Sequence, residues 1–212
     1  MGKNQQLFDA ICAGNPADTK KNVQALIDAG EKAEIILNET MIPAMREMGD
    51  RFANHDAYVP ELLLAANAVQ TGVKLLEPML AETGHQKLGK VAIGTVKGDI
   101  HDIGKNLVAT MLGGAGYDVV DLGTNCDLQK FVKAAENGAQ VVLCSALLTT
   151  TMPFMKKVVD YFKENDMNVK VIIGGAPVTQ EFADSINADG FGEDANMAVE
   201  VVDSFFKANI LK

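Results

Sequence analysis

Cysteine, proline and tryptophan are scarce in this sequence, and each shortage excludes a class of protein. The chain has 212 residues, of which 3 are Cys, 6 are Pro and none is Trp. The three cysteines are widely spaced and odd in number, so they form neither a disulfide framework nor a zinc site, and we expect a reducing compartment. With little proline and 48% hydrophobic residues, the chain is neither collagen-like nor disordered.

Long apolar runs and an excess of positive charge are also lacking. The apolar runs are far shorter than the roughly 20 residues that span a bilayer, and the N-terminus has no apolar signal-peptide core. The formal net charge is −9, from 19 basic and 28 acidic residues. Because phosphate binding needs a basic face, nucleic acid is not an expected partner. We therefore expect a cytoplasmic protein, without membrane contact, whose partners are proteins or a neutral ligand.

The first part of the chain, up to about residue 84, has helical periodicity. Apolar spacing predicts four helices, at about 7–11, 16–30, 32–52 and 59–80, which favours a four-helix bundle. Asn15 and Pro16 are typical of an N-cap and a first helical turn, and Gly30 can end that helix. Pro43 should kink the helix that contains it. We expect this bundle to be a domain over 1–84, followed by a polar linker at 85–90.

From residue 91 onward, apolar strands alternate with helices. Strands are expected near 91–96, 117–122, 140–145 and 169–174, with a weaker fifth near 190–191, and the last helix near 195–208. Such alternation predicts a doubly wound, five-stranded parallel sheet with helices on both faces. The fold class is thus α plus α/β, with the second domain over 91–212. The periodicity leaves the order of the strands open.

The most informative segment lies between the first expected strand and its helix, at residues 98–104. It reads Gly98, Asp99, Ile100, His101, Asp102, Ile103, Gly104. Open parallel sheets bind ligands at this kind of strand-to-helix loop. The Asp99 carboxylate can orient the ring of His101 through one ring nitrogen, while the other ring nitrogen faces a metal. His101 is therefore a candidate axial ligand. For Asp102 we favour the simpler role of capping the next helix.

Two more segments follow at the ends of later strands, 145–147 and 174–175. In this order, the three segments resemble the cobalamin-binding domain of corrinoid proteins and methionine synthases, which carries Asp-x-His-x-x-Gly, Ser-x-Leu and Gly-Gly. The resemblance implies a flavodoxin-like strand order and a cobalamin or related cobamide whose cobalt is bound by His101. Its nucleotide tail would thread a slot in the sheet. The implied cofactor-binding residues are Gly98, Asp99, His101, Asp102, Ile103 and Gly104 in the ligand loop, Ser145, Leu147 and Thr149 along the slot, and Gly174 and Gly175, which let the tail approach the backbone.

The resemblance extends to a hydrogen-bond relay and to the helical half of the chain. Thr151 stands where methionine synthase has the serine of a His–Asp relay, so Asp99, His101 and Thr151 are the residues expected to support the chemistry. Residues 49–60 resemble the cap segment over the corrin, and Phe52 and Val59 would shield the upper face of cobalt. The region 82–90 would act as a hinge that lifts this lid.

By resemblance, the chain is a methyl carrier without a catalytic pocket of its own. A substrate-specific methyltransferase would load a methyl group onto Co(I), and a second methyltransferase would move it from methyl-Co(III) to coenzyme M or tetrahydrofolate, as in methanogenesis or acetogenesis. A reductive activation protein is a further expected partner. The lower ligand must bind and release the cobalt during this cycle. An imidazole that is hydrogen-bonded to a carboxylate can do so by releasing or taking up a proton. Methanol, methylamines, aromatic ethers and betaines all remain possible donors.

Other interpretations stay open at this point. A mutase small subunit shares the histidine motif but does not need the helical cap, and cobalamin-dependent sensors place a tryptophan over cobalt, which this chain lacks. A flavin-binding flavodoxin-like domain is more distant. His101 could be an ordinary capped residue, Phe52 a bundle-core residue, and Ser145 and Thr149 simple strand-end hydroxyls. The threonines 149–151 could also cap a helix that Pro153 opens.

Overall fold

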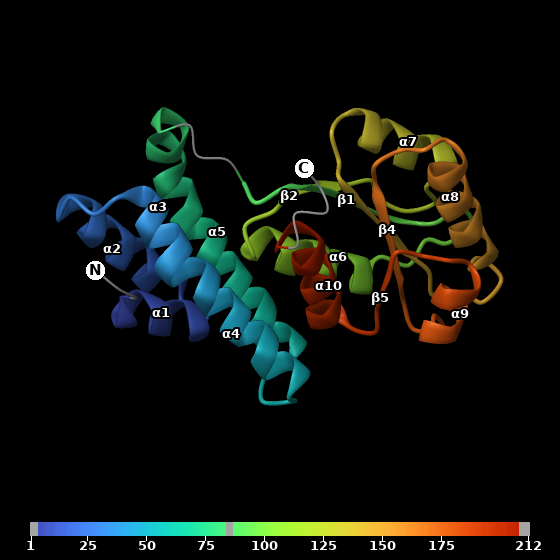
Figure 1. Ribbon diagram of the computed structural model, residues 1–212. Helices are drawn as coiled ribbons and strands as arrows, with labels where there is room; N and C mark the ends of the chain where they lie inside the picture. The colour runs from blue at the N-terminus through green and yellow to red at the C-terminus, as the bar shows by residue number, and fades with distance from the viewer. Residues whose placement is uncertain (1–3, 84–86, 208–212) are drawn as a thin grey trace. The chain divides into compact units, whose positions relative to one another are not determined.

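The computed structural model describes residues 4–83 and 87–207, which form two compact units along the chain (Figure 1). The helices α1 to α5 lie in the first unit, and the five strands found in these residues lie in the second. The expected domain limit at 84 and the start of the linker at 85 lie outside the described residues and stay predictions. No helix in the described ranges is both long and apolar enough to cross a membrane.

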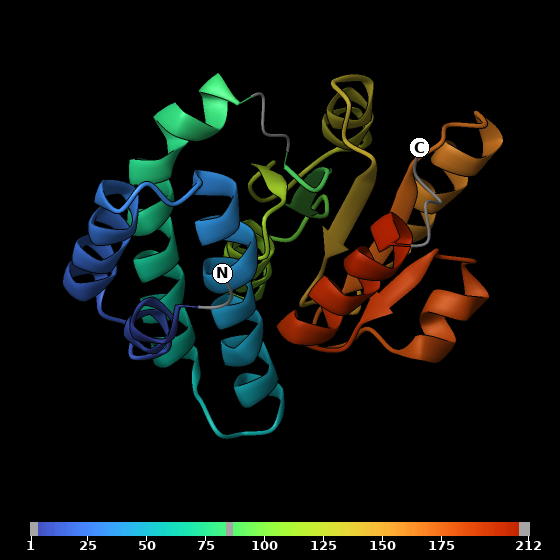
Figure 2. The same ribbon diagram turned by 60° about the vertical axis from the view of Figure 1, so that its left-hand side comes forward.

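The first unit is the expected four-helix bundle. Its elements are α1 (Gln5–Cys12), α2 (Pro16–Asp28), α3 (Ala33–Ile36), the π-helical segment η1 (Leu37–Met41), α4 (Ile42–Ala53) and α5 (Val59–Glu82). Since α3, η1 and α4 follow one another without a break, they make one continuous helical segment. The described residues of this unit therefore form four helical segments. The long helix α5 runs the length of the unit, with α2 and α4 beside it (Figure 2). Leu7, Ile11, Met45, Leu62 and Leu76 are among its fully buried side chains.

Two local sequence signals act differently in this bundle. Asn15 caps α2 as expected, because its side chain accepts hydrogen bonds from the N–H groups of Ala17 and Asp18, both at 3.1 Å. We expected a kink at Pro43. It lies in the first turn of α4, and the irregularity of the helix is the π-helical segment η1 just before it. Proline has no N–H and its ring crowds the carbonyl four residues earlier, so the preceding turn opens into a wider one.

The second unit is the expected parallel sheet with helices on both faces. Its elements are β1 (Lys90–Thr95), α6 (Ile103–Gly114), β2 (Asp118–Asp121), α7 (Leu128–Glu136), β3 (Val141–Ser145), α8 (Pro153–Glu164), β4 (Lys170–Gly174), α9 (Gln180–Ser185), β5 (Gly190–Gly192) and α10 (Ala195–Lys207). The strand order is β2-β1-β3-β4-β5, all parallel, which confirms the flavodoxin-like order implied by the resemblance. The strand β1 begins at Lys90, one residue before the expected start.

Alternate residues of the strands pack on opposite faces of this sheet. Ala92, Val142 and Val171 face a buried cluster that includes Phe131 of α7 and Phe162 of α8. Figure 1 shows α6 and α10 together on the other face.

The carboxyl ends of the three central strands are in register. Thr95 at the end of β1 pairs with Ser145 of β3, which pairs with Gly174 of β4. The three segments singled out in the sequence therefore meet at one edge of the sheet.

Replacing Phe131 by Ala should destabilise the second unit strongly, because its ring is fully buried among the strands and α8. We expect the free energy of unfolding to fall by about 3–5 kcal/mol. The control is Met197→Ala on α10, whose side chain is exposed and which should change stability by less than about 0.5 kcal/mol. Urea denaturation followed by circular dichroism measures both, and equal losses in the two variants would contradict this packing.

Candidate functional site

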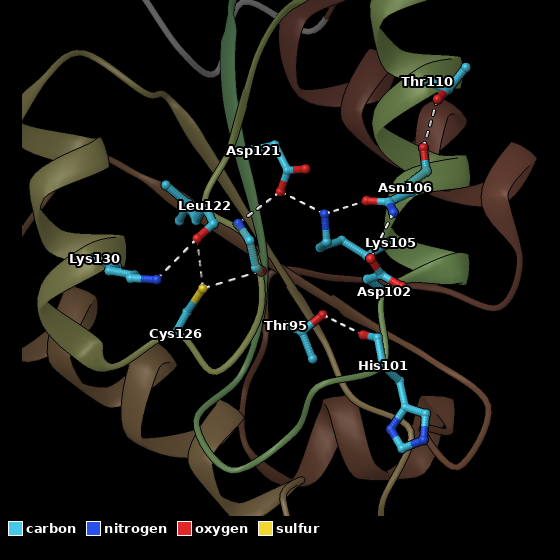
Figure 3. Close-up of polar contacts among 11 residues, drawn as sticks. Thr95, His101, Asp102, Lys105, Asn106, Thr110, Asp121, Leu122, Cys126 and Lys130 are labelled. Carbon is cyan, nitrogen blue, oxygen red and sulfur yellow. Dashed lines mark hydrogen bonds and ion pairs between the residues drawn. The ribbon is translucent and has the colours of Figure 1, made fainter.

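The loop between β1 and α6 is fastened to its surroundings at three backbone positions. The hydroxyl of Thr95 donates a hydrogen bond of 2.7 Å to the carbonyl oxygen of His101 (Figure 3). The N–H of Gly98 donates to the side-chain oxygen of Asn125 at 2.9 Å, and the N–H of Asn125 donates to the carbonyl of Asp99 at 2.9 Å. Neither Thr95 nor Asn125 was expected from the sequence, because both bond to backbone groups of the loop, which no side chain marks.

The carboxylate of Asp99 is the centre of the site, because it accepts hydrogen bonds from two loops while fully buried. Its Oδ1 accepts from the ring Nδ1 of His101 at 2.7 Å and from the His101 N–H at 3.1 Å. Its Oδ2 accepts from the N–H groups of Leu147 and Leu148, at 2.8 and 3.1 Å, and lies 3.0 Å from the hydroxyl oxygen of Thr151. The carboxylate thus joins the β1–α6 loop to the β3–α8 loop.

The environment keeps Asp99 ionised. Burial by itself would raise the pKa of Asp99, but the hydrogen bonds from the Leu147 N–H, the His101 N–H and ring, and the Leu148 N–H lower that pKa well below its usual range. A carboxylate held as an anion can fix the imidazole that it faces.

His101 presents one ring nitrogen to the outside. A carboxylate on Nδ1 favours the tautomer that carries its hydrogen there, which leaves the lone pair on Nε2 for a ligand. The side chain is 47% exposed, and Figure 3 shows the ring pointing away from Thr95. A single imidazole supplies one ligand bond, so it suits a metal whose other ligands come from a cofactor.

Four large apolar residues of the β1–α6 and β3–α8 loops, or at their ends, are exposed. Ile100 directly precedes His101, Ile103 is the first residue of α6, and they are 75% and 81% exposed. Leu147 and Leu148, whose N–H groups bind Asp99, are also exposed. Exposed apolar side chains gathered around a polar group are typical of a ligand or partner surface. Their chemistry fits the flat apolar face of a macrocycle held over the histidine; Leu147 and Ile103 were expected here, whereas Ile100 and Leu148 were not.

The expected slot residues lie along the same edge of the sheet. Ser145 is the partly buried last residue of β3, Thr149 is exposed in the loop that follows, and Gly174 ends β4. At Gly175, φ is +123° and a Cβ atom would stand 1.9 Å from the carbonyl oxygen of Ala146. The close approach of the two strand ends therefore already requires this glycine, independently of any ligand.

Thr151 reaches Asp99, so the hydrogen-bond chain Thr151–Asp99–His101 is present. The same hydroxyl lies 2.8 Å from the carbonyl of Leu148, and it has one proton to donate to one of these two acceptors. The idea that the threonines 149–151 cap α8 is wrong. The N-cap of α8 is Met152, which makes no side-chain capping bond.

Asp102 and Gly104 flank the start of α6. The Asp102 carbonyl accepts from the Asn106 N–H at 2.7 Å, and its carboxylate accepts from the Asn106 side chain at 3.1 Å. Gly104, the last glycine of the motif, is an exposed residue of the first turn of α6, with open space where a Cβ would stand.

The two residues expected to form a lid belong to the first unit. Phe52 lies in the last turn of α4 and Val59 is the first residue of α5, and both are half-buried. The connection between them is ordered by hydrogen bonds, since the N–H groups of Asp56 and Ala57 both donate to the carbonyl of Arg51. Their role as a lid stays a prediction.

Comparisons with known proteins bear on this geometry. Two family models, each described as a B12 binding domain, match residues 89–202 and 4–77. A corrinoid protein of Desulfitobacterium hafniense is 37% identical over 95% of this chain and 96% of its own length. A dimethylamine corrinoid protein of Methanosarcina mazei is 41% identical over 92% of each. The chain is also similar in structure to a chain of the methanol:cobalamin methyltransferase complex of Methanosarcina barkeri, with a TM-score of 0.84, 28% identity, and coverage of 95% of this chain and 78% of that one.

Replacing Gly175 by Ala should damage this edge of the sheet, because the added Cβ would overlap the Ala146 carbonyl. Gly138→Ala is a matched control: φ is +91° there too, but nothing lies within 4 Å of the added Cβ. Backbone strain alone should cost Gly138→Ala about 1 kcal/mol of unfolding free energy, and we expect Gly175→Ala to cost at least about 2 kcal/mol more. Chemical denaturation measures the difference, and equal costs would show that the strand ends have room.

Replacing Asp99 by Asn should flatten the dependence of stability on acid pH. Since the pKa of Asp99 is lower in the folded than in the unfolded chain, its charge stabilises the fold above the ordinary carboxylate pKa, and this contribution is lost as pH falls toward the folded value. Below about pH 5, the unfolding free energy of the parent protein should therefore fall more steeply than that of Asp99→Asn. Urea titrations of the apoprotein across pH test this, with the exposed Asp102→Asn as control; parallel curves for parent and Asp99→Asn would refute it.

Proposed function

This chain belongs to the corrinoid proteins that carry a B12-binding domain, and on that premise we propose that it is the methyl carrier of a corrinoid-dependent methyltransferase system. Its cofactor is a corrinoid. The observation that carries the proposal is the Asp99–His101 pair, which presents an imidazole among exposed apolar side chains at the carboxyl edge of a parallel sheet.

Each part of the site has a place in this proposal. His101 would bind the cobalt, Ile100, Ile103 and Leu147 would contact the macrocycle, and Ser145, Thr149, Gly174 and Gly175 would border the nucleotide tail. When bound, the corrinoid supplies a metal centre that accepts a methyl group from one partner and gives it up to another. The protein's own residues would hold that centre and orient the imidazole that binds it.

The hydrogen bonds around His101 suit a ligand that is exchanged in every cycle. The ionised Asp99 faces Nδ1 of His101 at 2.7 Å, so it keeps the ring oriented whether or not Nε2 binds the metal. The N–H groups of Leu147 and Leu148 hold the carboxylate in place through both states.

The expected partners follow from this role. We propose a substrate-specific methyltransferase as donor enzyme, a second methyltransferase that uses coenzyme M or tetrahydrofolate, and a reductive activation protein. The dimethylamine name of one relative and the methanol:cobalamin complex that contains another support the first of these and favour a carrier over a mutase subunit or a sensor.

We also propose that the first unit is a cap domain in which Phe52 and Val59 cover the upper face of the corrinoid. The region 82–90, part of which lies outside the described residues, would be the hinge that lifts the cap. We propose a cytoplasmic location as well, because three widely spaced cysteines suit a reducing compartment.

Replacing His101 by Ala should separate cofactor binding from cofactor ligation. We expect the variant still to take up cobamide through the slot, to lose the absorption spectrum of a histidine-ligated corrinoid, and to transfer methyl groups at least about tenfold more slowly in the presence of partner methyltransferases. Absorption spectra of the reconstituted protein and a coupled methyl-transfer assay give the two readouts.

His55→Ala is the matched control, because His55 is exposed in the loop between α4 and α5 and should leave both readouts unchanged. A His101→Ala protein with the parent spectrum would refute the ligand assignment. A parent protein that takes up no cobamide would refute the carrier function.

A further inference from the structure

Lys105 is a buried cation that the proposed function does not use. It lies in the first turn of α6, and its side chain is only 1% exposed. Lysine is almost never fully buried unless its charge is paired, because an ammonium group loses its hydration on burial. The placement of this charge four residues after His101 therefore needs an explanation in the structure.

The ammonium group of Lys105 lies at the middle of a hydrogen-bonded chain (Figure 3). It donates to Asp121 Oδ1 and to Asn106 Oδ1, both at 2.6 Å. The side-chain N–H of Asn106 in turn donates to the carboxylate of Asp102 at 3.1 Å. This series of hydrogen bonds thus runs from Asp121, the last residue of β2, to Asp102, which directly follows His101.

Asp121, at the β2 end of this series of hydrogen bonds, is itself connected to β1. Asp121 Oδ1 accepts a second hydrogen bond, of 2.9 Å, from the N–H of Gly123, whose carbonyl accepts from the N–H of Thr95 at 3.0 Å. The hydroxyl of the same Thr95 donates to the carbonyl of His101. The peptide of His101 is therefore held from two sides, by Thr95 directly and by Asp121 through Lys105.

The pair between Lys105 and Asp121 is ionic. Burial would raise the pKa of Asp121, but the hydrogen bond from Lys105 and that from the Gly123 N–H lower it below its usual range. At neutral pH the carboxylate is charged, and it supplies the counter-ion that the buried ammonium requires.

We propose that Lys105 and Asp121 are positioning residues that set the reach of the His101 ligand. The inference rests on the proposed role of His101 as lower ligand. Asp99 orients the ring through Nδ1, but the distance that Nε2 can reach depends on where the His101 backbone lies. Metal–ligand distances are held within about 0.2 Å, so a loop that shifts by more than this weakens the bond even when Asp99 is intact. The Lys105–Asp121 pair anchors the helix start that fixes this backbone.

The test compares Lys105→Met, which removes the charge and keeps the length, with Lys87→Met as matched control. Lys87 forms a 2.8 Å ion pair with Asp118 at the other end of β2, where both side chains are well exposed. The first readout is the axial-nitrogen signal in the electron paramagnetic resonance spectrum of protein loaded with cob(II)alamin. The second is hydrogen exchange of the amides of residues 98–102 in the apoprotein.

In Lys105→Met, we expect the equilibrium between bound and displaced histidine to shift about tenfold toward displacement. The amides of the loop, which include the His101 N–H bound to Asp99, should exchange faster, whereas Lys87→Met should change neither readout. Should Lys105→Met fail to fold, Asp121→Asn takes its place, because it alters a half-exposed side chain without changing its size. It should shift both readouts in the same direction.

A folded Lys105→Met protein with parent-like axial-nitrogen signal and loop exchange would overturn the proposal, even if its unfolding midpoint were lower, since the pair would then only stabilise the fold. A parent protein without an axial histidine signal would instead contradict the proposed function. The two failures are therefore distinguishable.

Discussion

The site depends on one buried carboxylate and the hydrogen bonds that keep it charged. Asp99 has no exposed surface, yet its oxygens accept from two loops of the sheet and from the ring of His101. A buried anion is tolerated only when such donors replace its hydration. The β3–α8 loop therefore must stay where its N–H groups reach Asp99, and the imidazole must stay on the other oxygen. Asp99 thus fixes the orientation of the His101 ring and the position of the β3–α8 loop, and it supplies the negative charge at this edge of the sheet.

Much of this arrangement could be predicted from the sequence. The spacing of Asp99 and His101 after an apolar strand indicated a ligand loop, and the register of β1, β3 and β4 brings the three singled-out segments to one edge. The strand order was not contained in the periodicity, and it came from the resemblance of the motifs. Thr151 was expected beside Asp99. The other two partners in the β3–α8 loop were hidden for a physical reason: they are backbone N–H groups, which every residue but proline carries, so no side chain marks them.

Other parts were missed because no local sequence pattern marks their contacts. Thr95 and Asn125 act on the loop from separate strand ends, and Lys105 looks like any helical lysine until the fold brings Asp121 to it. The threonine cap of α8 was a wrong expectation, since Thr151 lies beside Asp99 and the Leu148 carbonyl instead of the first turn of the helix. Local sequence signals thus worked where the partner is a few residues away, as at Asn15, and failed where tertiary contacts decided.

The proposed function requires that an imidazole of this chain, and not the cofactor's own base, binds the cobalt. The most direct measurement is electron paramagnetic resonance of the protein loaded with cob(II)alamin, prepared once with ordinary histidine and once with ¹⁵N-labelled histidine. We expect the axial-nitrogen splitting to change with the label in the protein. A splitting that ignores labelled histidine and changes only when the cofactor's base is labelled would contradict it.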